Sequence, residues 1–149
     1  MPLNIDLSSG AVDADFYDTF LMALCCWREA RGEIVAGKYA VCWSIKNRAD
    51  HPSWWGGPSI SSVVLKPMQY SSFNANDPNA TKFPLPTDTS WTASLLAAGQ
   101  VLAGMLVDPT MGATHYFDSS MDANPPVWAK DGSMVLTVTI GNLHFWKLA

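Results

Sequence analysis

Two glutamates follow a long uncharged stretch of the chain, where a carboxyl group could act as an acid. Residues 19–27 carry no charge and are almost all apolar, and Glu29 and Glu33 come shortly after them. If this stretch forms a buried helix, Glu29 lies at its C-terminal end. Burial and the negative end of the helix dipole both raise the pKa of a carboxyl group there. An acid that stays protonated near neutral pH is what general-acid cleavage of a glycosidic bond requires.

Glu33 is the second candidate for the same role. It lies four residues after Glu29 and would share its helix face, unless Gly32 turns the chain away. The structural alternative for either glutamate is a side chain that caps the helix end or forms an ion pair with Arg28 or Arg31. The spacing alone leaves both possibilities open.

Side chains suited to sugar binding gather in a long polar loop, 66–88, and in a predicted strand, 113–117. Such groups form hydrogen bonds with hydroxyls and amides, while aromatic faces stack against sugar rings. Alternation along the strand places His115 on the opposite face from its neighbours, and therefore away from a groove. The alternative is that Tyr116 packs in the core and Gln69 only stabilises the loop. We expect a groove that contains Glu29, Gln69, Tyr70, Thr114 and Tyr116.

The histidines and cysteines do not point to a metal or to a nucleophile. The three histidines lack the local spacing of a metal site, so we expect no metal and no cofactor. Cys25 and Cys26 lie among apolar residues, where a thiolate would be destabilised. Together with Cys42 they give an odd number with one adjacent pair, which is no disulfide framework. We expect all three to be small buried thiols.

The elements that must position these residues are helices first and strands later. Apolar periodicity predicts a buried helix that ends near Gly32, and further helices over 35–48, 59–65 and 89–105. Alternating residues predict strands over 113–117, 135–140 and 143–147, with Gly141-Asn142 as a hairpin turn. The predicted class is α+β, mainly helical with a small antiparallel sheet in the C-terminal part. We expect one catalytic domain over 1–149, of which 1–14 form an irregular lead-in.

Composition excludes several classes of protein. The net charge is −4 with only nine Lys plus Arg, which argues against nucleic-acid binding through phosphate neutralisation. The longest uninterrupted apolar run, 20–27, is far shorter than the ~20 residues that a membrane-spanning helix needs. No secretory signal is visible at the N-terminus. We therefore expect no nucleic-acid partner, no membrane insertion and no export signal.

Four blocks of sequence, in order, resemble the SleB/CwlJ-type cell wall hydrolases. Residues 27–49 read WREARGEIVAGKYAVCWSIKNRA, similar to the family's EARGEP and LNR signatures, and residues 63–71 resemble its V-V…Q-F-S segment. Residues 112–117 and 125–129 resemble its G-A-T-H and P-x-W block, and residues 140–145 its closing I-G-x-H-x-F. The chain departs from the pattern at Ile34, Lys38, Tyr70 and Leu143, and none of these departures removes a carboxylate.

The resemblance implies a lysozyme-like fold and a lytic transglycosylase that cleaves between N-acetylmuramic acid and N-acetylglucosamine of peptidoglycan. One glutamate then serves as acid and afterwards as base, and the resemblance places it at Glu29, with Glu33 as runner-up. Trp54 and Trp55 would join the aromatic residues of the cleft and stack on sugar rings. The side chains that would contact the glycan strand are Gln69, Tyr70, Ser71, Thr114, Tyr116 and Trp128.

Within this family, the compact chain, for which we expect no separate wall-binding module, fits a phage endolysin. We expect it to be a monomer that collects in the host bacterial cytoplasm before it is released to the wall. Two alternatives stay open. One is a muramidase that hydrolyses the same bond with a second carboxylate, such as Glu33. The other is a glycan-binding or phage structural module that has the fold without the activity.

Overall fold

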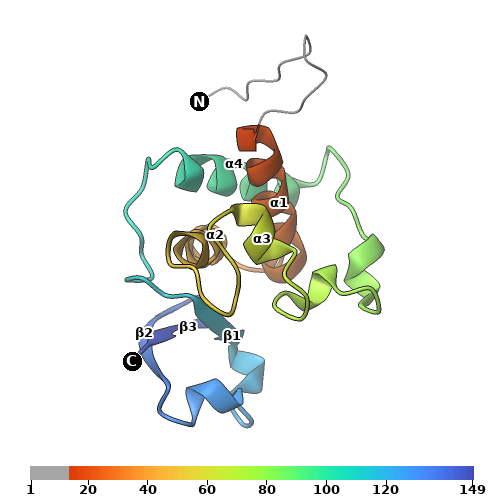
Figure 1. Ribbon diagram of the computed structural model, residues 1–149. Helices are drawn as coiled ribbons and strands as arrows, with labels where there is room; N and C mark the ends of the chain where they lie inside the picture. The colour runs from red at the N-terminus through yellow and green to blue at the C-terminus, as the bar shows by residue number, and fades with distance from the viewer. Residues whose placement is uncertain (1–13) are drawn as a thin grey trace.

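The computed structural model describes residues 14–149, and its helices lie together above a small sheet (Figure 1). Helix α1 runs through the middle of the helical part, with α4 packed along one side and α2 and α3 on others (Figure 1). Of the predicted lead-in, only Ala14 is described, and it begins α1; the rest lies outside the described residues. The helices are α1 (Ala14–Ala30), α2 (Val35–Asp50), α3 (Ile60–Val64) and α4 (Thr89–Leu102).

The sheet follows the helices in the chain and is antiparallel throughout, in the order β1-β3-β2. A two-residue turn at Gly141-Asn142 joins β2 to β3, as predicted. Four short 3-10 helices punctuate the connections: Ser71–Phe73, Pro78–Thr81, Ser119–Met121 and Val127–Ala129. The α+β prediction, mainly helical with a small C-terminal sheet, is confirmed. The strands are β1 (His115–Asp118), β2 (Met134–Ile140) and β3 (Leu143–Leu148).

The core is built around the apolar run of α1. Met22, Ala23, Cys25 and Cys26 are fully buried, because α2, α3 and α4 all pack against this helix. Nearly all-round burial explains why the run carries no charge. All three cysteines are free and buried, which confirms their predicted place in the core.

Two predicted boundaries differ from the structure. Helix α4 ends at Leu102 rather than near Met105, because Gly104 has a φ of +69° and turns the chain out of the helix. Strand β1 begins at His115, two residues later than predicted. The later start changes which side chains of this strand reach the candidate site.

Lysine 38 closes the C-terminal end of α1. Its buried ammonium group donates hydrogen bonds to the backbone oxygens of Ala30, Arg31 and Glu33, at 3.0, 3.1 and 2.7 Å. These carbonyls lie at the end of α1 and in the turn that follows it, so the ammonium group adds a partner to each and offsets the negative end of the helix dipole. The turn between α1 and α2 is thereby fixed just after Glu29.

Arginine 28 fastens the long loop to α1. Its guanidinium donates to the backbone oxygens of Ser72, Ala80 and Lys82, and it lies over the ring of Phe73 at 4.7 Å. The ion pair that the sequence suggested between Arg28 and a glutamate is not formed. Its donors instead bring the loop, including Ser72, against the last turn of α1.

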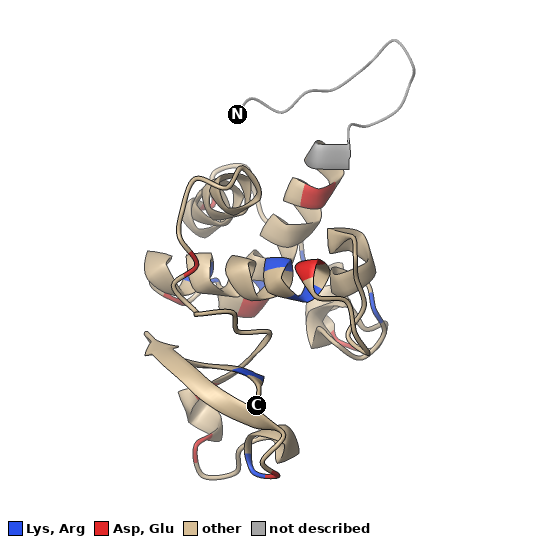
Figure 2. Ribbon diagram, turned by 60° about the vertical axis from the view of Figure 1, so that its left-hand side comes forward, with Lys and Arg blue, Asp and Glu red and all other residues tan. Residues whose placement is uncertain are grey.

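Charged residues are sparse over the described residues. In Figure 2 the short blue and red segments are spread over the helices and the C-terminal part. No helix of the described part is both long and apolar enough to cross a membrane.

Candidate active site

Glutamate 29 lies in the last turn of α1, where the long loop crosses the helix end. The buried hydroxyl of Ser72 donates a hydrogen bond of 2.9 Å to Glu29 Oε1. Burial raises the pKa of Glu29 above its usual value, and the negative charge of Asp77 raises it further. The Ser72 hydrogen bonds and the charge of Arg28 lower the pKa, but burial has the larger effect. The carboxyl group is therefore held in place and biased towards its acid form.

Two adjoining cavities, of about 490 and 220 Å³, meet at Glu29. The smaller one is completed by the loop residues Tyr70 and Ser71. The larger extends past β1 to Trp128. Because the two share so much of their lining, they form one groove with Glu29 at its middle. The residues that line both are Glu29, Arg48, Met68, Gln69 and Tyr116.

Arginine 48, from the last turn of α2, connects the groove to two segments that are distant in sequence. Its side chain is 5% exposed, and it donates from Nε to the backbone oxygen of Thr114 and from Nη1 to Gln69 Oε1 at 3.3 Å. Its guanidinium also lies over the ring of Tyr70, at 5.0 Å from the centroid. One side chain thus ties the long loop to the start of β1.

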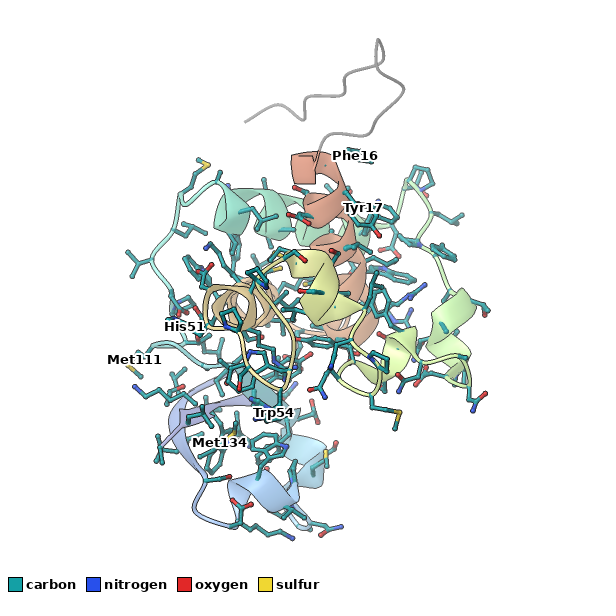
Figure 3. The ribbon with its side chains drawn as sticks, in the orientation of Figure 1. Phe16, Tyr17, His51, Trp54, Met111 and Met134 are labelled. Carbon is teal, nitrogen blue, oxygen red and sulfur yellow. The ribbon has the colours of Figure 1, made fainter. Side chains whose placement is uncertain are left out.

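Aromatic rings form the wall of the larger cavity. Trp54 lies where the loop after α2 approaches the C-terminal part (Figure 3), with its ring 5.2 Å from that of His115. His115 in turn contacts Trp128 at 5.1 Å. Trp54 is 56% exposed, whereas Trp55 is only 2% exposed, so the expectation that both line the cleft is wrong for Trp55. Trp54 and Trp128 present the ring surface on which a sugar could stack.

The two tyrosines differ in their exposure. Tyr70 is buried, burial raises its pKa, and its hydroxyl has no hydrogen-bond partner in the described part of the chain. Tyr116 is partly buried and lines both cavities, and its ring packs 5.7 Å from that of Phe145. Burial also raises the pKa of Tyr116, and the nearby charge of Glu29 adds to the effect. Both hydroxyl groups therefore stay protonated beside the acid.

The structure reverses the predicted facing of the strand. His115 lines the larger cavity, whereas Thr114 lines neither. Thr114 precedes β1, its carbonyl accepts from Arg48, and its hydroxyl lies 3.0 Å from His115 Nδ1. Burial, together with the charge of Arg48, lowers the pKa of His115 to about 3, so its ring is neutral at physiological pH. The prediction that Thr114 points into the groove and His115 away from it is wrong.

Glutamate 33 lies outside the groove. The chain turns after Ala30, and Glu33 accepts a hydrogen bond of 3.4 Å from the backbone N–H of Asn142 in the β2–β3 turn. It lines neither cavity, so the runner-up for the acid has no access to a ligand bound there. The second carboxylate that does line the larger cavity is Asp118, which sequence reasoning did not select.

Sequence reasoning also missed three further residues of the site: Arg48, Ser72 and Met68. Arg48 stands in the quoted asparagine–arginine pair of the family pattern, so its signal was present but not used. Ser72 follows the predicted Ser71, and the 3-10 turn of Ser71–Phe73 directs Ser72 rather than Ser71 to Glu29. Met68 gave no signal. Among the described residues, no cluster of three or more His, Cys, Asp and Glu could hold a metal ion.

Comparison with known proteins identifies the family. A spore cortex-lytic enzyme of Halalkalibacterium halodurans is 30% identical over 113 residues, or 76% of this chain, although the chain spans only 31% of that relative's length. The catalytic domain of the Bacillus cereus SleB protein superimposes with a TM-score of 0.63 at 25% identity, over 93% of this chain and 94% of that domain. The catalytic domain of the germination-specific lytic transglycosylase SleB of Bacillus anthracis gives 0.62 at 27% identity, over 93% and 98%.

The sequence pattern of one family matches most of the chain, over residues 32–146. The match begins just after Glu29, so it covers the groove residues contributed by α2, the long loop and β1 but not Glu29. The candidacy of Glu29 as the acid rests on its position in the groove and on the resemblance of residues 27–49 to the family motif. By this match, the chain belongs to the Cell Wall Hydrolase family.

Proposed function

We propose that this chain is a lytic transglycosylase that cleaves the glycan strands of peptidoglycan, with Glu29 as its acid and base. One observation carries the proposal: Glu29 lies at the middle of the groove, with one carboxyl oxygen bonded to Ser72 and a raised pKa. Membership of the Cell Wall Hydrolase family and the likeness to a lytic transglycosylase of known structure support it.

In this proposal the two carboxyl oxygens of Glu29 have different tasks. Ser72 donates to Oε1, so the proton of the acid form lies on Oε2. This proton passes to the glycosidic oxygen as its bond to C1 of N-acetylmuramic acid breaks, and the leaving sugar departs as an alcohol. The carboxylate then takes the proton of the 6-hydroxyl while O6 bonds to C1. A 1,6-anhydro sugar results, Glu29 regains its proton, and no water is consumed.

The test is lysis of purified cell walls, followed by turbidity, with mass spectrometry of the products. Anhydro-muramyl ends are expected, and Glu29→Gln should lower the rate by about 10²- to 10⁴-fold while it leaves the fold intact. Glu33→Gln is the matched control, with a rate close to wild type, because Glu33 lies outside the groove. Lysis by Glu29→Gln at the wild-type rate would refute the assignment of the acid.

Reducing ends among the products would instead indicate a muramidase, since hydrolysis places water on C1. The observation that favours this second candidate is Asp118, a carboxylate in the lining of the larger cavity. In that case Asp118→Asn should abolish lysis. With anhydro ends, the same substitution should leave bond cleavage in place, because no second carboxylate is needed.

We also propose that the chain acts as a monomeric phage endolysin held in the host cytoplasm until the membrane is opened. The chain covers nearly all of the two catalytic domains of known structure, which supports a catalytic unit of this size. Production inside a bacterium should leave the cells intact until a separate membrane-permeabilising protein is supplied. Lysis without such a protein, or an assembly larger than one chain in light scattering, would contradict this.

A further inference from the structure

Arginine 48 is a buried cation that makes no ion pair within the described residues. The ion pairs of this part of the chain, Lys46–Asp50 and His144–Asp122, do not include it. Its Nε and Nη1 donate instead to two neutral oxygens, the carbonyl of Thr114 and Oε1 of Gln69. A buried charge held in this way serves to fix the groups that it touches.

An arginine side chain has donors and no acceptor, so it determines how the amide of Gln69 is turned. The oxygen of this amide must face Arg48, and its NH₂ group must then face the other way. Gln69 lines both parts of the groove beside Glu29, so a ligand bound there can reach its NH₂ group. We propose that Arg48 is a positioning residue that makes Gln69 present an N–H donor to the acetamido carbonyl oxygen of the bound glycan. This inference rests on the proposed function.

The backbone next to Gln69 is held in an unusual conformation that supports this role. Met68 has a φ of +68°, in the left-handed region that favours glycine, although it is not glycine. Its N–H donates a hydrogen bond of 3.1 Å to the side chain of Asn74, within the same loop. Backbone strain of this kind persists where the surrounding structure imposes it, and it clusters at ligand sites. The backbone N–H of Gln69 donates to the backbone oxygen of Lys66 at 3.2 Å, so the loop fixes where the side chain begins and Arg48 fixes how its amide is turned.

The acetamido carbonyl fits this donor better than the other groups of an amino-sugar strand. It is a pure acceptor, whereas hydroxyls both donate and accept and bind either orientation of the amide. A glucosamine without its acetyl group carries an ammonium ion, which only donates. That ion would meet the N–H of Gln69 and the charge of Arg48, so its binding is opposed by both. The groove should therefore discriminate in favour of N-acetylated glycan.

The test measures wild type and Gln69→Glu on two forms of one wall preparation. One form is fully N-acetylated, and the other has been chemically de-N-acetylated. The substitution nearly conserves the shape and still gives Arg48 an oxygen, but it replaces the N–H donor by a carboxylate oxygen. Wild type should prefer the acetylated wall, and kcat/KM of Gln69→Glu on that wall should fall about tenfold or more. The preference of Gln69→Glu for the acetylated wall should decrease or invert, because the carboxylate at position 69 accepts a hydrogen bond from the ammonium ion of the de-N-acetylated sugar.

Two further variants separate positioning from a general loss of structure. Arg48→Lys retains the charge but cannot hold both oxygens in one plane, so it should raise KM more than it lowers kcat and weaken the preference. Thr92→Glu adds a negative charge on the exposed face of α4 and should leave the preference at the wild-type value. The proposal is overturned if wild type shows no preference for the acetylated wall, or if Gln69→Glu keeps that preference. Should wild type lyse neither wall, the proposed function fails, and co-sedimentation with the two walls still measures the preference without turnover.

Discussion

The Glu29 carboxyl is subject to opposing influences, and their balance sets the pH at which it can act. Burial and the charge of Asp77 favour the protonated acid, whereas Ser72 and Arg28 favour the carboxylate. Since the net effect is a raised pKa, the acid form persists to higher pH than in an exposed glutamate. The rate of bond cleavage should therefore fall as pH rises through the pKa of Glu29.

Ser72→Ala removes a donor that stabilises the carboxylate. The pKa of Glu29 should rise further, so the alkaline decline of kcat/KM should move to higher pH, while kcat falls because the carboxyl is no longer fixed. Rates measured from acid to alkaline pH on soluble wall fragments test this. A decline that stays at the wild-type pH would show that Ser72 does not act on the acid.

Glu29→Gln should also change how stability depends on pH. In wild type, the folded state holds the Glu29 proton more tightly than the unfolded chain does. The free energy of unfolding therefore falls as pH rises from the ordinary glutamate pKa through the raised value. The variant lacks this loss, so its stability relative to wild type should increase between pH 4 and pH 7. Urea unfolding at both pH values measures the difference, and an equal difference at both would contradict the raised pKa.

Cys25 lies in the core beneath the acid, and burial raises the pKa of its thiol. Cys25→Ala should cost about 1–2 kcal/mol of stability through lost packing, with little change in the rate per folded molecule. Urea unfolding and wall lysis test the two halves of this prediction. A folded protein that a thiol-blocking reagent inactivates completely would argue for a cysteine in the chemistry.

At the scale of elements, periodic patterns in the sequence predicted the helices and strands whose formation depends on neighbouring residues. The apolar repeat of α1 and the alternation of β2 and β3 are properties of neighbouring residues, and these elements lie where expected. The end of α4 was missed, because Ala103 and Gly104 leave the helix well before the stronger stop signals at 108–112. Boundaries depend on such single residues, whereas the elements themselves depend on many.

The candidate site was harder to predict, because its contacts join segments that are far apart in the chain. Gln69, Tyr70, Ser71, Tyr116 and Trp128 do line the groove, but their roles stay predictions. Alternation gave the wrong face for Thr114, since the carbonyl of this residue is held by Arg48, 66 residues earlier. No pattern among neighbouring residues predicts this contact between Arg48 and Thr114. Ser72 was missed for a similar reason, because its contact with Glu29 joins the long loop to the end of α1, whereas the predicted Ser71 lines the smaller cavity.

The loop that carries Trp54 depends on a glycine. Gly56 has a φ of +107°, and a Cβ there would lie 2.4 Å from the backbone oxygen of Ser62. Gly56→Ala should therefore lower Tm and displace Trp54, with weaker glycan binding as a result. Gly99→Ala is the matched control: a Cβ in that part of α4 meets nothing within 4 Å, and alanine should add about 0.5–1 kcal/mol of stability. Thermal unfolding of both variants tests the contrast.

At the scale of the whole molecule, the groove is lined by residues of both the helical part and the sheet. Figure 1 shows these two parts one above the other. Glu29 comes from α1, Arg48 from α2, Gln69 from the long loop and His115 from β1. Arg28 and Arg48 hold these parts together by donating to backbone oxygens rather than to carboxylates. In a protein with few charges, two arginines thus hold the segments around the candidate acid together.

The position of β1 at the edge of the sheet bears on the order in which the protein is made. Within the sheet, β1 pairs with β3 alone, and β3 is the last strand of the chain. A growing chain on the ribosome therefore displays Glu29 early, but β1 has no strand to pair with until residues 143–148 have emerged. The wall of the groove that holds His115 and Tyr116 cannot form before then. Translation itself delays the candidate site, and a chain that is cut short before β3 carries Glu29 without the strand that β1 pairs with.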